Sequence, residues 1–138
     1  MINFHKEAHS YIGVPFIHRG RTRRGLDCVG LVILAAKDCG YKRYREFAYG
    51  REPRSTVLES VLNEHFGEPI DDKPAVNDVV LMQLKPNAAP SHIGIITTHP
   101  DGLGIIHAYG SVNRVVYHRL TEKVRSKITG VYRWPAKY

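Results

Sequence analysis

The sequence predicts an α+β fold in which N-terminal helices, one of them a central buried helix, pack on a C-terminal antiparallel β-sheet. The first observation is an almost continuous apolar run, Val29 to Ala36, which is typical of a buried helix. The second is that helical periodicity precedes Gly67 and short β-branched runs follow it. Helices first and strands afterwards indicate an α+β arrangement. With 138 residues and no linker-like stretch, we expect one domain over residues 1–138.

Three stretches of the first half carry helical signals. Residues 4–12 follow Asn3, a suitable N-cap, and residues 56–66 carry an apolar stripe at helical spacing. Between them, Asp27 is a suitable N-cap for a helix over residues 28–38. We expect residues 18–25 to form a basic loop and residues 41–54 to form a second loop.

The second half alternates apolar β-branched runs with turn residues, which is typical of a strand meander. The predicted strands are Val79 to Leu84, Ile93 to Thr98, Gly104 to Tyr109, Arg114 to Leu120, and Ile128 to Trp134.

Composition excludes several classes of protein. At 43% hydrophobic and 24% charged residues the chain is neither disordered nor fibrous. Its longest apolar run is too short to cross a bilayer, so we expect no membrane insertion. The first residues lack a basic start and an apolar core, so we expect synthesis in the cytoplasm without a signal peptide.

The net charge of +7 favours anionic partners. Four arginines, at positions 19, 21, 23 and 24, lie just ahead of Cys28, whereas Lys42, Arg43 and Arg45 are interpreted as a solvated face. A nucleic-acid binder is one alternative. Because no helix-turn-helix, zinc finger or aromatic-studded sheet motif is present, we expect no specific nucleic-acid partner.

The two cysteines, Cys28 and Cys39, cannot pair while one helix joins them. Eleven residues of helix rise about 16 Å, and a disulfide needs Cα atoms within about 7 Å. Cys39 is interpreted as a small buried hydrophobe. Cys28 starts the apolar helix, where unpaired N–H groups and the helix dipole stabilise a thiolate, and we expect Arg23 and Arg24 to add to this effect.

Two of the eight histidines stand out. His92 begins a strand directly after Pro90 and Ser91, a position that faces a cleft, and His107 lies on the next strand. Across a hairpin the two rings become neighbours, so one imidazole can serve as base and the other can orient it. A buried histidine bonded to a backbone carbonyl is the alternative for His107. His18 lies in the basic loop and is expected to line a cleft; the others, His118 included, are expected at the surface.

Three sequence blocks occur in an informative order. The first contains Gly13-Val14-Pro15-Phe16 and then Asp27-Cys28-Val29-Gly30, the second contains Val76-Asn77-Asp78, and the third contains Ser91-His92-Ile93-Gly94-Ile95, with His107 on the next strand. In these blocks the chain resembles the NlpC family of cell-wall cysteine peptidases, which have a reduced papain-like fold.

The resemblance implies a cysteine hydrolase that cleaves amide bonds in the peptide stems of peptidoglycan through a thioester. Cys28 would be the nucleophile, His92 the general base and His107 the residue that orients His92. The family needs no metal or other cofactor, and an endopeptidase is expected rather than an amidase. The Cys28 backbone N–H suits the developing oxyanion.

The chain departs from the family at Phe16, where a tyrosine usually stands. Phenylalanine cannot donate a hydrogen bond, and losing one oxyanion donor costs about 10²–10³ in kcat. His18, Tyr11 and Tyr109 are candidate replacements. For substrate binding we expect Phe16 and His18 beside the nucleophile, with Arg23 and Arg24 pairing the carboxylates of the stem.

Short, basic members of this kind resemble hydrolases encoded among bacteriophage tail genes. The resemblance implies a location in the virion, tail-tip or hub proteins as partners, and action in the host cell wall or periplasm. A weakly active or inactive tail-assembly module with the same fold is the alternative function. A metal site built from Cys28, His92 and His107 is a further alternative, although their separations of 64 and 15 residues match no compact ligand motif.

Overall fold

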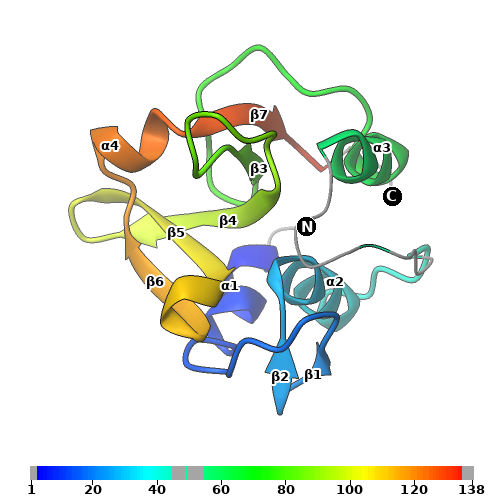
Figure 1. Cartoon of the computed structure of the whole chain (residues 1–138). Helices are drawn as coiled ribbons and strands as arrows, with labels where there is room; N and C mark the ends of the chain where they lie inside the picture. The colour runs from blue at the N-terminus through cyan, green and yellow to red at the C-terminus, as the bar shows by residue number, and fades with distance from the viewer. Residues whose placement is uncertain (1–2, 45–48, 50–54, 135–138) are drawn as a thin grey trace.

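The computed structural model describes residues 3–44, 49 and 55–134 (Figure 1). Most of the loop predicted over residues 41–54 therefore lies outside the described residues. The helices are α1 (Phe4–His9), α2 (Cys28–Asp38), α3 (Ser55–Phe66) and α4 (Glu122–Arg125), with a 3-10 turn, η1 (Gly110–Val112). The strands are β1 (Arg21–Thr22), β2 (Gly25–Leu26), β3 (Val79–Met82), β4 (His92–His99), β5 (Gly102–Tyr109), β6 (Arg114–Arg119) and β7 (Ile128–Tyr132).

The five longer strands form one antiparallel sheet in the order β6-β5-β4-β3-β7. Strands β3 to β6 follow one another as a meander, as predicted. The last strand does not extend this meander beyond β6, because α4 carries the chain back to the opposite edge, where β7 pairs with β3 (Figure 1). The predicted α+β class is confirmed.

Helix α2 is the buried central helix that the sequence predicts. The Asp27 side chain caps it, since its Oδ1 accepts the Gly30 N–H at 2.8 Å. Gly40 follows the helix with a positive φ of 91°, a conformation that glycine adopts without strain. A Cβ atom at Gly30 would lie 2.3 Å from the Gly20 carbonyl oxygen. Glycine at this position therefore lets the β1–β2 hairpin pack directly on the first turn of α2.

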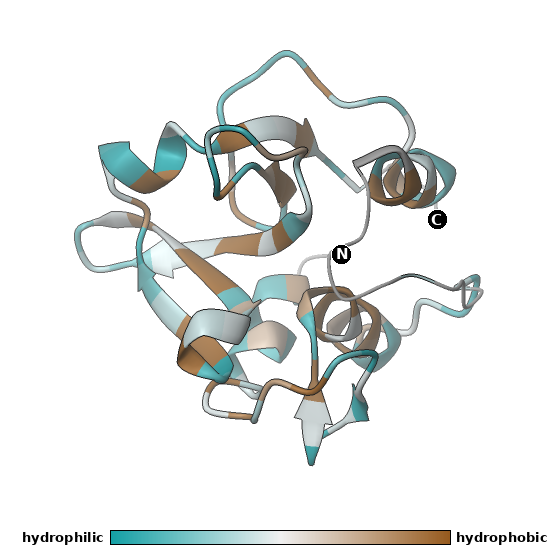
Figure 2. Ribbon diagram, in the orientation of Figure 1, coloured by the Kyte–Doolittle hydropathy of each residue, from teal (hydrophilic) through white to brown (hydrophobic). Residues whose placement is uncertain are grey.

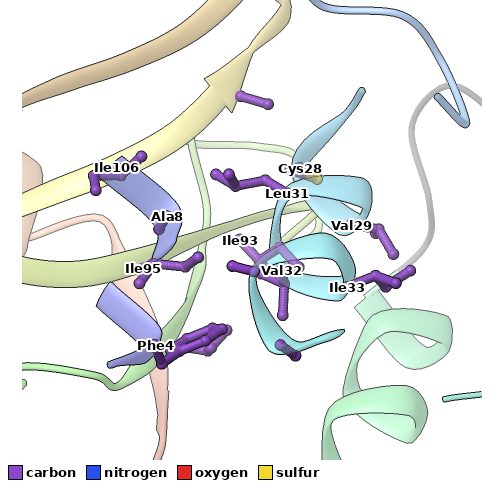
Figure 3. Packing of buried hydrophobic residues seen from close by; sticks show 14 of the residues in the cluster. Phe4, Ala8, Cys28, Val29, Leu31, Val32, Ile33, Ile93, Ile95 and Ile106 are labelled. Atoms are coloured by element: carbon purple, nitrogen blue, oxygen red, sulfur yellow. The ribbon is translucent and has the colours of Figure 1, made fainter. Parts of the chain in front are cut away.

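The sheet buries both of its faces. Because side chains alternate along a strand, Ile95 and Ile106 face α1 and α2, where they join Phe4, Ala8 and Leu31 (Figure 3). A second cluster, on the opposite face, contains Val80, Met82, Ile96, Ile105, Leu120 and Val131. Figure 2 shows the contrast between apolar α2 and polar α4. Each buried aliphatic or aromatic side chain contributes about 1.5–3 kcal/mol to folding.

Besides the η1 turn, three elements were not predicted. The basic loop contains the two-residue strands β1 and β2, which are too short for an alternating pattern, and α4 spans a single turn. Helix α1 ends at His9, earlier than expected. Within the described ranges, no helix combines the length and the apolarity needed to span a bilayer.

Candidate active site

A cleft of about 290 Å³ opens where the start of α2 meets the sheet. This volume is close to the lower limit for small-molecule sites. Asp27 and Cys28 line it from α2, and His92 lines it from the start of β4. The other lining residues are Phe16, His18, Tyr49, Leu84, Lys85, Ala88, Ala89, Ser91, Ala108, Tyr109, Gly110 and Ser111. The sequence-predicted nucleophile and base thus share one cleft with Phe16 and His18.

The Cys28 thiol is almost enclosed, with 7% of the residue exposed. Burial, together with the negative charge of Asp27, raises the pKa of Cys28 to about 12. The backbone N–H groups of Ile93, Val29 and Cys28 donate toward the sulfur and oppose that rise. The prediction of a thiolate at the helix start is therefore wrong, because desolvation raises the pKa of the Cys28 thiol more than the N–H groups lower it. The resting group is a protonated thiol that needs a base.

His92 lies beside His107 in the way that the predicted hairpin requires. The His92 Nε2 and His107 Nδ1 atoms are 2.7 Å apart, and both residues are buried. Burial lowers the pKa of His92 to about 4, so its ring is neutral near pH 7. Among the described residues, no hydrogen bond involves Nδ1 of His92. A neutral imidazole with one unbonded nitrogen can accept a proton.

A third imidazole extends the pair. His107 Nε2 lies 2.9 Å from His118 Nε2, and His118 Nδ1 lies 2.9 Å from the Arg119 carbonyl oxygen. Burial, with His92 and His118 close by, lowers the pKa of His107 to about 3. The expectation that His118 is a surface bystander is wrong, because β6 places it next to β5. Strand alternation in the sequence indicates which residues share a strand face with His118. It does not indicate the register of β6 on β5, which brings His118 to His107.

Gly94 lies beside the ring pair and makes room for Ile105. It lies on β4 two residues after His92, so both residues share one face, and the β4–β5 register places it across from His107. A Cβ atom at Gly94 would lie 2.8 Å from Ile105 Cδ1 and 3.4 Å from His107 Cβ. Glycine at this position therefore leaves the space that the Ile105 side chain occupies beside His107.

Asp27 is the centre of a polar network at the wall of the cleft. Its Oδ2 accepts the Tyr49 hydroxyl at 2.5 Å and the Arg19 backbone N–H at 2.8 Å. Arg21 donates to Asp27 Oδ1 at 3.1 Å and to the Tyr49 hydroxyl at 2.7 Å. Buried carboxylates need partners of this kind. The network fixes the residue directly before Cys28 and seats Tyr49 in the cleft wall, a role that the sequence did not indicate.

Arg23 and Arg24 do not reach the cleft, which corrects their prediction as neighbours of the thiol and as substrate-binding residues. The Arg23 guanidinium lies 4.1 Å from the centre of the Tyr11 ring and donates to the Ser10 carbonyl oxygen. Arg24 is exposed at the turn of the β1–β2 hairpin. The hairpin directs these two side chains away from the α2 start, whereas Lys85 is a cation that does line the cleft.

The candidate replacements for the oxyanion tyrosine are also separated by the structure. The Tyr11 hydroxyl donates to Asp38 Oδ2 at 2.6 Å, at the far end of α2, so it does not serve the cleft. His18 and Tyr109 both line the cleft, as does Phe16.

Both cysteines are free thiols, and Cys39 is half-buried rather than fully buried. Over the described ranges, no group of three or more histidine, cysteine, aspartate or glutamate side chains has a metal-binding arrangement.

The model of the NlpC/P60 family matches residues 13–133, which include every residue of the cleft. The chain belongs to the NlpC/P60 family. No curated protein matches the sequence.

Solved structures of this family share the fold. An NlpC/P60 family protein from Bacillus cereus is 18% identical with a TM-score of 0.67, over 96% of this chain and 39% of that protein. The NlpC/p60 domain of the peptidoglycan hydrolase SagA is 19% identical with a TM-score of 0.62, over 96% of this chain and 97% of that domain. An N-acetylmuramoyl-L-alanine amidase from Bacteroides uniformis is 14% identical with a TM-score of 0.62, over 95% and 96%. The reduced papain-like fold is confirmed, and the chain spans about two fifths of the Bacillus cereus protein.

Proposed function

We propose that this chain is a cysteine hydrolase that cleaves amide bonds in the peptide stems of peptidoglycan. The observation that carries the proposal is the shared cleft, in which the Cys28 thiol and the neutral His92 ring are both lining residues. Membership of the NlpC/P60 family and the similarity to a peptidoglycan hydrolase domain and to an N-acetylmuramoyl-L-alanine amidase support the substrate class.

In the proposed first step, Nδ1 of His92 removes the thiol proton while the Cys28 sulfur attacks the carbonyl carbon of the scissile amide. A general base is required because the buried thiol does not ionise unaided near neutral pH. The His92 imidazolium keeps its Nε2–H directed at His107 Nδ1, 2.7 Å away, which stabilises the new charge.

The tetrahedral intermediate places a negative charge on the former carbonyl oxygen. The Cys28 backbone N–H is at the start of α2, where helix amides have no intrahelical acceptor, and it can donate to this oxygen. His18 or Tyr109 supplies the second donor that Phe16 lacks. Collapse breaks the C–N bond, and His92 returns its proton to the departing amine. Water, deprotonated by His92, then hydrolyses the thioester and restores the thiol.

We assign the reaction to an endopeptidase rather than an amidase, although an amidase has the same fold. Lys85 is a cation that lines the cleft and can pair with a stem carboxylate, in place of Arg23 and Arg24. Location in a bacteriophage tail, with tail-tip or hub proteins as partners, stays a prediction. Phe16 favours the second candidate, a weakly active tail-assembly module, because it removes one oxyanion donor.

Digestion of purified peptidoglycan tests the proposal. The wild-type chain and a Cys39→Ser control should release the same peptide fragments, and Cys28→Ala should release them below about one thousandth of that rate, since loss of a nucleophile removes the acyl-enzyme route. Mass spectrometry of the fragments identifies the bond. Equal release by wild type and Cys28→Ala would contradict the hydrolase. No release by any of the three would favour the assembly module.

A further inference from the structure

The ring pair of the cleft is the start of a longer chain of hydrogen bonds. It runs from His92 on β4 to His107 on β5, then to His118 on β6, and ends at the Arg119 carbonyl oxygen. Its three links measure 2.7, 2.9 and 2.9 Å. The first two histidines are buried, while His118 is half-buried at the edge strand of the sheet.

With the His118 ring neutral, the end of this chain sets the direction of every link. A backbone carbonyl oxygen only accepts, so Nδ1 of His118 carries the hydrogen. In a neutral ring, Nε2 of His118 is then an acceptor, and Nε2 of His107 must donate to it. His107 Nδ1 is therefore an acceptor in turn, and Nε2 of His92 donates to it.

The consequence falls on the atom that the reaction needs. With its hydrogen on Nε2, His92 has a lone pair on Nδ1, the only one of its ring nitrogens that can receive a proton. The opposite tautomer would place a hydrogen on Nδ1 and leave no acceptor for the Cys28 proton. It would also set the His92 and His107 lone pairs against each other across 2.7 Å.

We propose that His118 is a positioning residue that, anchored on the Arg119 carbonyl, sets the tautomers of His107 and His92 and keeps Nδ1 of His92 available as the base. This inference rests on the proposed function, in which His92 acts on Cys28. His118 is not among the residues that line the cleft. It acts only through His107.

The place of His118 in the fold supports this role. Its strand is held at both ends, because β6 pairs with β5 over residues 104–109 and the Arg114 end forms a bridge with Pro15. The sheet register pairs His118 with Ile105, on the same strand face as His107. A half-buried edge position also tolerates substitution better than the enclosed positions of His92 and His107.

Two substitutions distinguish the loss of the hydrogen-bond acceptor at position 118 from the loss of the histidine side chain itself. His118→Gln retains an oxygen acceptor for the His107 Nε2–H, whereas His118→Leu retains bulk without an acceptor. Loss of a residue that orients a functional histidine typically costs about 10–100-fold in activity. The leucine variant should therefore lose about 10–100-fold in kcat with KM unchanged. The glutamine variant should stay within about threefold of wild type. His99→Leu, at another half-buried strand histidine, is the matched control and should leave kcat unchanged.

Long-range ¹H–¹⁵N NMR correlations of the imidazoles give a readout that does not depend on hydrolysis. Wild type and His118→Gln should show His92 and His107 with their hydrogens on Nε2. His118→Leu should show a mixture of tautomers at both rings. An unchanged His92 tautomer in His118→Leu, or equal loss of kcat in both variants, would overturn the proposal. If the wild type cleaves no peptidoglycan, the NMR result still decides the role of His118 and only the proposed function fails.

Discussion

Two groups of histidines lie on opposite faces of the same strand, β4. On the face shared with His92, the ring chain ends at an open cleft. On the other face, the Thr97 hydroxyl lies 2.9 Å from His5 Nδ1 and 2.8 Å from His9 Nε2. The His5 backbone N–H donates to Asn77 Oδ1. Burial lowers the pKa of His5 and of His9, as it does for His92.

The difference between these groups is what makes one of them a candidate site. The His5–Thr97–His9 group holds α1 on the sheet. The His5 and His9 rings pack against each other, and the His9 ring also packs against Tyr117. The His92 ring, in contrast, lines a cleft beside a thiol and retains a ring nitrogen without a hydrogen bond to any described residue. Burial and hydrogen bonding alone therefore do not distinguish a functional histidine from a structural one. Access to a reactive neighbour does.

The largest expected contrast is in catalysis. His92→Gln should lower kcat for peptidoglycan hydrolysis by about 10²–10⁴, because it removes the general base. His9→Gln, in the structural group, should change kcat by less than about threefold. Fragment release measured at matched protein concentration checks both variants, with melting curves to confirm folding. Comparable losses in the two variants would erase the functional difference between the two groups.

A second expected effect concerns acid stability. The pKa of His92 falls from its ordinary 6.5 to about 4 in the folded chain, so between these values the unfolded chain binds the extra proton. Above about pH 6.5 the His92 ring is neutral in both states and does not lower the free energy of unfolding. As the pH falls toward 4, His92 lowers the free energy of unfolding by on the order of 3 kcal/mol.

Urea unfolding at pH 7.5, 5.5 and 4.5 measures this loss. His92→Gln should flatten the pH dependence more than His9→Gln does, because the larger pKa shift belongs to His92. A steeper dependence in His92→Gln than in wild type would contradict the assignment of the acid sensitivity to the cleft.

Part of this architecture could be predicted from the sequence, and the reason is local. Asp27, the apolar helix after it, and the strand runs act through neighbours along the chain, so caps and periodicities indicated them. The pairing of His92 with His107 was within reach because one short hairpin joins their strands.

The rest depends on contacts between distant parts of the chain. Predicting that His118 lies beside His107 would have needed the register of β6 on β5. Predicting that Arg23 packs on Tyr11 would have needed the path of the β1–β2 hairpin. The protonated state of Cys28 required its burial, which the position at a helix start does not indicate. Charge near a residue in sequence was a poor guide to charge near it in space.

Alkylation of Cys28 tests the coupling between the thiol and His92 most directly. In a Cys39→Ser background, the iodoacetamide rate should be measured from pH 5 to 10 with His92 present and with His92→Gln. Near pH 7 the chain with His92 should react at least about tenfold faster, because the imidazole accepts the proton that the buried thiol retains. The difference should narrow toward pH 10, as hydroxide begins to ionise the thiol without help from the ring. Superimposable profiles would show that the sulfur and the ring do not act together, and the proposed mechanism would be wrong.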